Sequence, residues 1–414
     1  MANSRLLRDV DFCVPYTGGL IMRQGNATRL YDLPEQRRIQ QRLLNRPSLL
    51  IDPFPPFHAP LFSPLTRLGY RNAYIVWAAI NIFLWVVFYC LIRSGPGSRM
   101  NPFRYLALSS LFAPLWIAIV QGQFSMLVLV AFALAFLYLK QGRDILAGFA
   151  LGLGLVKFQA VLPFAAILLL RKKWRFISGL AGAAALLGVV SVIAVGWQCV
   201  VSYANLMSDF MKHASDPVYA VKPWNMPTVR GFVTGLLDGR IPNAWISVLW
   251  TGVSGSLILI TACSWELDER RERASFDLMF AAALVVAALT APHLLAHDLT
   301  PIAFAAILVL ASPEWAFKSR ECLVIAFAIG LLYASPLYLA QLVAREKVFV
   351  LAPVLLILAG GVLVLAGKKG FREPEGNIVQ PPFEVLASPG QSDSSAGIEL
   401  RASALFSLVR RGRL

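Results

Sequence analysis

The sequence predicts an all-α, polytopic transmembrane protein with about nine to eleven membrane helices. Hydrophobic residues make up 57% of the 414-residue chain and charged residues only 15%, whereas charged residues are about a quarter of a soluble globular protein. The apolar runs lack the alternation of apolar and polar residues that barrel strands show. Because backbone polar groups must find partners inside hydrocarbon, runs of this kind form helices.

Residues 1–72 precede the first apolar run and contain no stretch long enough to cross a bilayer. Charged residues from Arg5 to Asp11 interrupt the start, so no signal peptide is predicted. Residues 34–46 predict a short polar surface helix, and a Pro-rich loop follows at 52–60. We expect residues 1–72 to form the first non-cytoplasmic loop.

The apolar runs occupy most of residues 73–367, for which we expect a multi-span membrane domain. They cover residues 73–92, 105–120, 124–139, 145–170, 176–196, 244–263, 276–289, 299–310, 322–339 and 348–366. From residue 368 onward the chain is polar and rich in Ser, Pro, Gly and Glu. This composition predicts a disordered cytoplasmic tail over 368–414.

Orientation follows from the short loops, because cytoplasmic loops carry an excess of Lys and Arg. The run 145–170 has basic clusters at both ends, one near Arg143 and one at 171–175. A re-entrant helical hairpin with Lys157 near its tip would keep both clusters in the cytoplasm, whereas a single span would separate them. We expect the hairpin, whose arms of about 12 residues are too short to cross alone. The loop 197–243 and the turn 292–298 then lie on the non-cytoplasmic side.

The charge balance and the cysteines argue against two further classes of protein. The chain carries 38 Lys+Arg against 23 Asp+Glu, a formal net charge of +15. The basic excess lies beside the spans, where it fixes orientation and meets the headgroups of membrane lipids, so we expect no nucleic-acid partner. The five cysteines are odd in number and none has metal-binding spacing. We therefore expect no disulfide framework, no metal site and no cofactor.

Lys157 is the clearest candidate for a functional residue within an apolar run. An ionisable side chain at membrane depth is costly and marks a functional site by default. Lys157 precedes Pro163 in a broken helical segment, and broken helices at this depth normally line a cavity. The alternative is a structural lysine that extends to the interface or pairs with a carboxylate.

A second candidate site is formed by His293, His297 and Asp298, between Pro292 and Pro301. The i, i+4 spacing of the two histidines puts both on one helical face. This spacing also fits a metal pair, but no Glu lies between them as in metalloproteases. We favour binding of a polar headgroup over a metal, with a plain interfacial turn as the alternative.

For two further groups of residues, the side-chain chemistry alone does not decide between a functional and a structural role. Arg230, close to Asn225, suits a phosphate or a sugar, although a plain structured loop explains this segment equally well. Any carboxylate of the first loop could be the solvated side chain of a loop, and composition favours none of them: Asp9, Asp11, Asp32, Glu35 and Asp52.

The order and spacing of several short motifs resemble glycosyltransferase family 87, whose members are polyprenyl-phosphate-sugar-dependent membrane transferases. The matching segments are 11–16, 25–32, 54–64, 121–123, 143–148, 152–163, 170–175 and 290–298, with a weaker match at 225–231. Together they cover about residues 9–310. One departure is Phe54, which stands where the family has Tyr before two prolines.

The resemblance implies a multi-helical transferase of the GT-C superfamily in the inner (plasma) membrane. It would move a hexose, commonly mannose, from a polyprenyl-phosphate-linked donor to a lipid or glycan acceptor on the non-cytoplasmic face, with inversion. Asp11 matches the family's general base. The leaving phosphate needs cations or N–H donors, and the candidates for donor and substrate binding are Lys157, Arg230, His293, His297 and Asp298.

The family also begins with a membrane span ahead of the Asp-Phe motif, so the resemblance implies that a first span is missing from residues 1–72. The competing hypothesis is a transporter or flippase of lipid-linked sugars. Two features argue against it: the chain shows no repeated halves, which many secondary transporters have, and its first polar segment carries an Asp-bearing motif that transport does not need.

Overall fold

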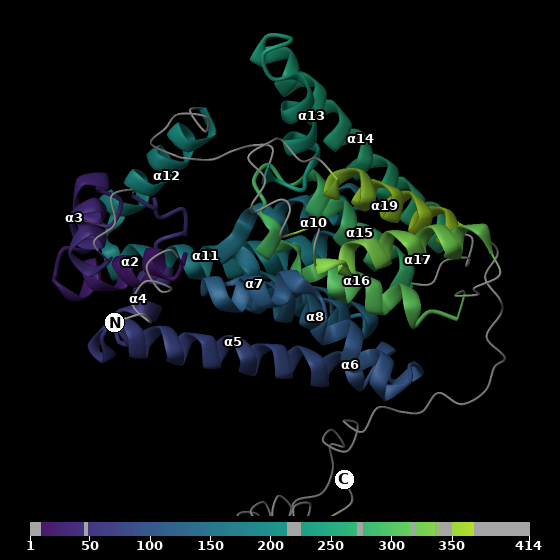
Figure 1. Cartoon of the computed structure of the whole chain (residues 1–414), viewed down its shortest axis with the longest axis horizontal. Helices are drawn as coiled ribbons and strands as arrows, with labels where there is room; N and C mark the ends of the chain where they lie inside the picture. Colours follow the sequence, from purple (N-terminus) through teal and green to yellow (C-terminus); the bar gives the residue numbers. More distant parts are fainter. Residues whose placement is uncertain are drawn as a thin grey trace, which may run out of the picture. The chain divides into compact units, whose positions relative to one another are not determined.

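A computed structural model of the chain describes residues 10–44, 49–212, 225–270, 276–313, 315, 319–335, 338 and 350–367. These residues belong to one compact unit within residues 1–371 (Figure 1). They form helices and turns and contain no strand, which confirms the all-α class. The tail expected over 368–414 lies outside the described residues.

Four helical segments of the described chain are long and apolar enough to cross a membrane. They are α5 (Tyr70–Arg93), the segment Asp144–Leu170, α11 (Trp174–Val195) and the part Asn243–Trp265 of α14 (Asn243–Arg270). The expected run 105–120 is broken into α6 (Pro102–Ser110) and α7 (Ala113–Gln121), which meet at 48° and make a fifth span if taken together. Pro114 accounts for the break, because it lacks the N–H that would continue the helix and its ring crowds the carbonyl four residues earlier, whereas proline is tolerated in the first turn of α7.

Shorter apolar helices complete the membrane part: α8 (Ser125–Lys140), α15 (Phe276–Thr290), η6 with α16 (Ala296–Leu310) and α19 (Leu351–Gly367). The described chain also contains η3 (Pro96–Arg99), α13 (Val229–Leu237) and α17 (Arg320–Tyr333). The protein is thus a polytopic helical membrane protein. The expected nine to eleven membrane helices are reached only if the shorter helices also cross.

The contacts of this segment support the re-entrant hairpin expected over 145–170. The segment consists of α9 (Asp144–Leu151), the 3₁₀ helix η4 (Gly152–Lys157) and α10 (Phe158–Leu170), and by length and composition it also qualifies as one candidate span of 27 residues. Helix α9 packs closely against α11 and runs in the same direction: a Cβ on Gly148 would lie 1.9 Å from the backbone oxygen of Phe176, and one on Gly152 would lie 2.2 Å from Ala183 Cβ. Because α10 ends at Leu170 and α11 begins at Trp174, both ends of the segment lie near the start of α11, and the chain reverses around η4.

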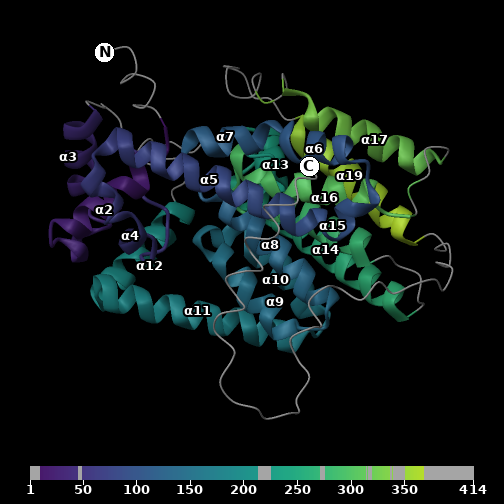
Figure 2. The same ribbon diagram turned by 90° about the horizontal axis from the view of Figure 1, so that it is seen from below.

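The membrane helices form two packed groups. Helices α5, α8, α9 and α11 pack against one another in that order, and Figure 2 shows α8 and α9 between the long helices α5 and α11. Helix α15 is buried along its whole length and is surrounded by α10, α14, α16 and α19. A buried helix that is apolar on all sides between its two ends is typical of the centre of a helical bundle.

Residues 10–68 are not an extended loop but a set of short helices: α2 (Cys13–Arg23), η1 (Ala27–Arg29), α3 (Leu33–Leu44), α4 (His58–Phe62) and η2 (Leu65–Leu68). Helix α3 is the expected surface helix at 34–46. Helix α12 (Trp197–Lys212) lies beside this set in both views (Figures 1 and 2). Gln40 holds the connection after α3, because its side chain exchanges two hydrogen bonds with the backbone of Leu50, at 2.7 and 3.0 Å.

Aromatic side chains join this N-terminal set to the membrane helices. The ring of Phe62 lies 4.6 Å from that of Trp77 on α5, and the ring of Phe54 lies 4.8 Å from that of Phe124 before α8. Trp77 Nε1 donates a hydrogen bond of 2.8 Å to the carbonyl of Gly122. Aromatic pairs of this kind add to the area they bury, and they bring residues 10–68 against the turn 121–123.

Candidate active site

One cavity of about 270 Å³ gathers polar side chains from five regions of the chain. Its lining comes from residues 11 and 14, 49–51, 53 and 54, 123, 157 and 159, 210 and 225, and 293, 295, 297 and 298. Among these are five of the six residues that the sequence singled out: Asp11, Lys157, His293, His297 and Asp298. A concave site with a few convergent polar groups is the usual form of a ligand site.

Lys157 and Asp298 form a buried ion pair on one side of this cavity. Lys157 Nζ donates to Asp298 Oδ1 and, at 3.1 Å, to the hydroxyl of Ser125. The Ser125 hydroxyl donates in turn to Asp298 Oδ1 at 3.1 Å, and the backbone N–H of Leu295 donates to Asp298 Oδ2 at 3.1 Å. Lys157 is therefore paired with a carboxylate and also lines the cavity.

The two histidines line the same cavity, but the prediction that they share one helical face is wrong. Residues 291–295 form a turn, and only His297 lies in a helix, the 3₁₀ helix η6 (Ala296–Leu299). The reason is that Pro292 lacks an N–H and the Asp298 side chain takes the Leu295 N–H. His297 Nε2 lies 3.5 Å from Asp298 Oδ2.

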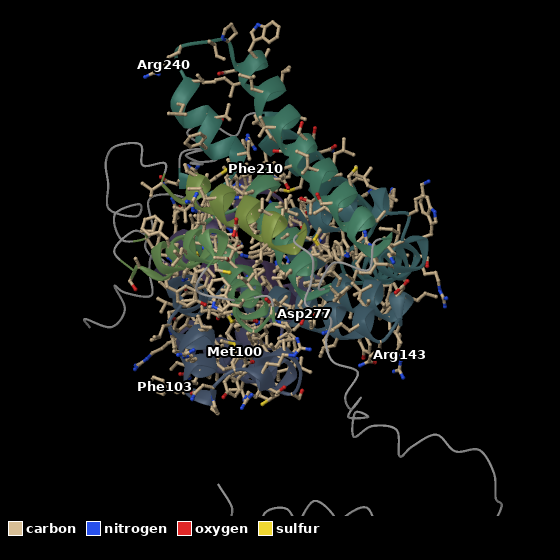
Figure 3. The ribbon with its side chains drawn as sticks, turned by 90° about the vertical axis from the view of Figure 1, so that its right-hand side faces the viewer. Met100, Phe103, Arg143, Phe210, Arg240 and Asp277 are labelled. Carbon is tan, nitrogen blue, oxygen red and sulfur yellow. The ribbon has the colours of Figure 1, made fainter. Side chains whose placement is uncertain are left out.

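His293 is uncharged at neutral pH. Burial lowers its pKa to about 4, outweighing the opposite effect of the Asp298 carboxylate. Its ring packs edge-on against Phe210 at 5.4 Å, and its Nδ1 has no hydrogen-bond partner among the described residues. Figure 3 labels Phe210. His293 can therefore offer a hydrogen bond to a ligand but not a positive charge.

Asp11 is held by the turn that follows α7. Its backbone N–H donates to Gln121 Oε1 at 3.1 Å, and Gln123 Nε2 donates to Asp11 Oδ2 at 2.7 Å. Gly122 makes this approach possible, because it has a φ of +68° and a Cβ there would lie 2.6 Å from Phe12 Cβ. Within the part of the chain that the structure describes, the Asp11 carboxylate has no cationic partner.

The other first-loop carboxylates face elsewhere. Asp32 pairs with Arg29 at 2.7 Å on the surface, Glu35 pairs with Arg38, and Asp52 pairs with His58 at 3.0 Å away from the cavity. Asp9 lies outside the described residues. Of the first-loop carboxylates that the structure describes, Asp11 alone lines the cavity.

Arg230 does not line the cavity, although Asn225 does. Its Nη1 donates at 2.9 Å to the carbonyl of Pro292, and its guanidinium lies over the ring of Trp250 at 5.7 Å. Burial lowers the pKa of Arg230. Arg230 therefore supports the turn that carries His293 rather than facing the cavity itself.

A second ion pair lies at the other end of α8 and α15. Lys140 Nζ is 2.8 Å from Asp277 Oδ1, and Arg99 Nη1 is 3.6 Å from Asp277 Oδ2. Figure 3 shows Asp277 well separated from Phe210, which lines the cavity. Among the residues described, no group of three or more His, Cys, Asp or Glu side chains could hold a metal ion.

An apolar groove of about 380 Å³ lies beside the cavity. Two segments of the chain contribute to both spaces. In the first segment, Pro53 and Phe54 line the cavity, and residues 55–57 line the groove. In the second, Lys157 and Gln159 line the cavity, and Leu155 and Phe158 line the groove. The rest of the groove is formed by α11 and α12. A cavity with convergent polar side chains therefore adjoins an apolar groove.

Sequence reasoning missed three polar side chains of this site. Ser125 ties Lys157 to Asp298, Gln123 orients Asp11, and Gln159 lines the cavity. Gln123 was visible as part of a motif, but nothing in the motif assigned it to Asp11. Ser125 opens an apolar helix, and a polar residue at that place is the one signal that could have identified it.

A family model described as Glycosyltransferase family 87 matches residues 53–292, more than half of the chain. The match includes Lys157, Arg230 and the Pro-rich loop, while Asp11 precedes it and His293 follows directly after it. No curated protein and no solved structure matches the sequence significantly.

Proposed function

We propose a specific reaction for this chain, which belongs to glycosyltransferase family 87 and is a glycosyltransferase. It transfers a hexose, with mannose as the first candidate, from a polyprenyl-phosphate-linked donor. The acceptor is a hydroxyl group of a lipid or a glycan. Transfer takes place on the non-cytoplasmic face of the plasma (inner) membrane and inverts the anomeric carbon.

The observation that carries this proposal is the pairing pattern in the cavity. Lys157 is neutralised by Asp298, whereas the Asp11 carboxylate accepts a hydrogen bond from Gln123 and has no cationic partner among the described residues. A carboxylate in this state can accept a proton. Asp11 is therefore the general base of the proposed reaction.

The proposed step is a single displacement. Asp11 takes the proton of the acceptor hydroxyl, and the hydroxyl oxygen forms a bond to the anomeric carbon. The bond between that carbon and the phosphate oxygen breaks, and the phosphate leaves with the electron pair. One displacement inverts the configuration, and the sequence of events needs no redox partner.

Other groups that line the cavity suit the leaving phosphate. A lysine has three N–H donors, and Lys157 uses one for Asp298 and one for Ser125, so a third can meet a phosphate oxygen. His293 adds a neutral hydrogen-bond donor. Preorganised donors aimed at developing negative charge are a large part of catalysis in general.

The adjoining groove supports a lipid-linked donor over a nucleotide-linked one. Its lining is apolar, and it shares two walls with the polar cavity. A polyprenyl-phosphate sugar has the matching form, with a polar sugar-phosphate followed by a long apolar chain. A nucleotide sugar would place a charged, polar group in the apolar groove, which costs desolvation energy.

The test uses purified full-length protein in lipid nanodiscs. Synthetic polyprenyl-phosphate mannose and glucose are offered with lipid and glycan acceptors, and products are identified by mass spectrometry and by the anomeric signals in NMR. We expect an inverted product from a lipid-linked hexose and none from nucleotide sugars. Transfer from a nucleotide sugar alone, or retention of configuration, would overturn the proposal.

A further inference from the structure

Three consecutive carbonyl groups of the Pro-rich loop are each held by a side chain from a different segment. The three hydrogen bonds are Tyr203 Oη to Pro53 O at 3.3 Å, Tyr31 Oη to Phe54 O at 2.7 Å, and His58 Nδ1 to Pro55 O at 2.8 Å. Proline has no N–H to donate, and the backbone holds the end of this loop, where the N–H groups of His58 and Ala59 each donate at 3.1 Å to the carbonyls of Pro55 and Pro56. Side chains hold the carbonyls of Pro53 and Phe54 and add a second bond at Pro55.

The third of these side chains, His58, is itself fixed by a buried acid. Because a carbonyl only accepts, Nδ1 of His58 carries a proton, and its Nε2 faces Asp52 Oδ2 at 3.0 Å. Asp52 Oδ1 accepts the N–H of Phe54 at 3.0 Å, and both side chains are buried. Burial lowers the pKa of His58, but the Asp52 carboxylate outweighs this effect and raises it, so the protonated ring is favoured.

Helix α2 is adapted to this pair. A Cβ on Gly18 would lie 2.6 Å from His58 Nε2 and 3.1 Å from Asp52 Oδ2. No side chain larger than glycine fits there without displacing one member of the pair. Gly18, Asp52 and His58 therefore form one unit that packs against the loop and does not line the cavity.

The loop that these side chains hold is the partition between the two spaces of the site. Pro53 and Phe54 face the polar cavity, and the three residues that follow face the apolar groove. In the proposed function, this partition lies where the sugar-phosphate of the donor meets its lipid chain. A shift of Phe54 would change both spaces at once.

We propose that Tyr31, His58 and Asp52 are positioning residues that fix the partition loop 53–57 and thereby determine how a lipid-linked donor is seated. This inference rests on the proposed function. The three residues act on donor binding and not on the displacement, because Asp11 is held separately by the turn 121–123. Their loss therefore raises KM for the donor and leaves kcat nearly unchanged.

The first experiment compares two substitutions that each remove one tyrosine hydroxyl. Tyr31→Phe releases the carbonyl of Phe54. Tyr105→Phe, in α6, releases the carbonyl of Tyr89 in α5, which is bonded at the same distance of 2.7 Å. Both tyrosines are buried, so both variants should lose similar thermal stability. We expect KM for polyprenyl-phosphate mannose to rise about five- to tenfold in Tyr31→Phe, as for one lost hydrogen bond, and to stay unchanged in Tyr105→Phe.

The second experiment tests whether an uncharged donor at the position of His58 Nδ1 is enough to hold the carbonyl of Pro55. In Asp52→Asn/His58→Asn, the new amide nitrogen takes about the place of Nδ1 and can still donate to Pro55. In Asp52→Asn/His58→Gln it takes about the place of Nε2 and cannot. We expect the first double variant to keep a KM close to that of the wild type, and the second to show the raised KM of Tyr31→Phe.

The outcomes separate the inference from the function on which it rests. If Tyr31→Phe and Tyr105→Phe change KM equally, or if the two double variants do not differ, the positioning role is wrong while the transferase remains. If the wild type transfers no hexose from any lipid-linked donor, the proposed function fails and the inference fails with it.

Discussion

Gln123 Nε2 donates a hydrogen bond of 2.7 Å to Asp11 Oδ2, although the two residues lie 112 positions apart in the sequence. This bond fixes the carboxylate at the edge of the cavity. Gln121 supports it by accepting the backbone N–H of Asp11 at 3.1 Å. The candidate base and the turn that orients it are therefore a single structural unit.

Asp11→Asn should remove transfer and leave donor binding nearly intact. The amide keeps the size of the carboxylate but cannot take a proton, and a positioned base contributes about 10²–10⁴-fold in rate. The control is Asp32→Asn, which changes a carboxylate paired with Arg29 on the surface of the same segment and should be nearly silent. Transfer rates and donor affinity of purified protein provide the measurement. An active Asp11→Asn variant would remove the general base from the mechanism.

Gln123→Glu should be more harmful than Gln123→Leu. The glutamate places a second carboxylate against Asp11 Oδ2, and like charges at this separation raise the pKa of one partner. The pH–rate profile of Gln123→Glu should therefore move to higher pH, whereas Gln123→Leu should lower the rate without moving the profile. Profiles that coincide in shape would show that Gln123 does not act through the Asp11 carboxylate.

Lys157→Met should destabilise the protein by about 3–5 kcal/mol, because it leaves the Asp298 carboxylate buried without its cation. The double variant Lys157→Met/Asp298→Leu removes both charges and should recover most of this stability. It should not recover transfer, which needs the lysine at the donor phosphate, and Lys157→Arg should keep more activity than Lys157→Met. A stable double variant with wild-type activity would make the pair purely structural.

His293 should make the folded protein sensitive to mild acid. Its pKa is about 4 in the folded state and about 6.5 in an unfolded chain. Above pH 6.5 this histidine is neutral in both the folded and the unfolded protein. Between pH 6.5 and 4 only the unfolded chain binds the proton, so the stability of the folded state falls as the pH falls. The melting temperature in detergent should decrease less from pH 7 to 4.5 in His293→Gln than in the wild type. His58 is present in both proteins, so its contribution to the pH dependence of stability is the same in each. An equal decrease in melting temperature in the two proteins would contradict the prediction.

Residues 144–170 should begin and end on the same side of the membrane. In a chain whose five native cysteines are replaced, Gln141→Cys and Arg175→Cys should react with an impermeant thiol reagent from the same side of sealed vesicles. Both residues are exposed in the structure, so access is not limited by packing. Labelling of the two positions from opposite sides would contradict the re-entrant hairpin formed by α9, η4 and α10.

The sequence by itself determined the class of the protein, because membrane helices depend on local apolar runs of sufficient length. It also pointed to Asp11, Lys157 and His293, since an ionisable residue in an apolar run or a matching motif is visible without a fold. What it could not determine was which groups meet. The two basic clusters predicted a hairpin at 145–170, and the tight packing of Gly148 and Gly152 on α11, with α9 parallel to α11, shows how the segment folds back.

Only the tertiary structure showed that Lys157 is paired with Asp298, that Arg230 supports the Pro292 carbonyl, and that Asp52 holds His58 rather than lining the cavity. The physical reason is the same in each case. A buried charge or polar group must find its partner in space, and these partners come from segments that the sequence separates by up to 141 positions.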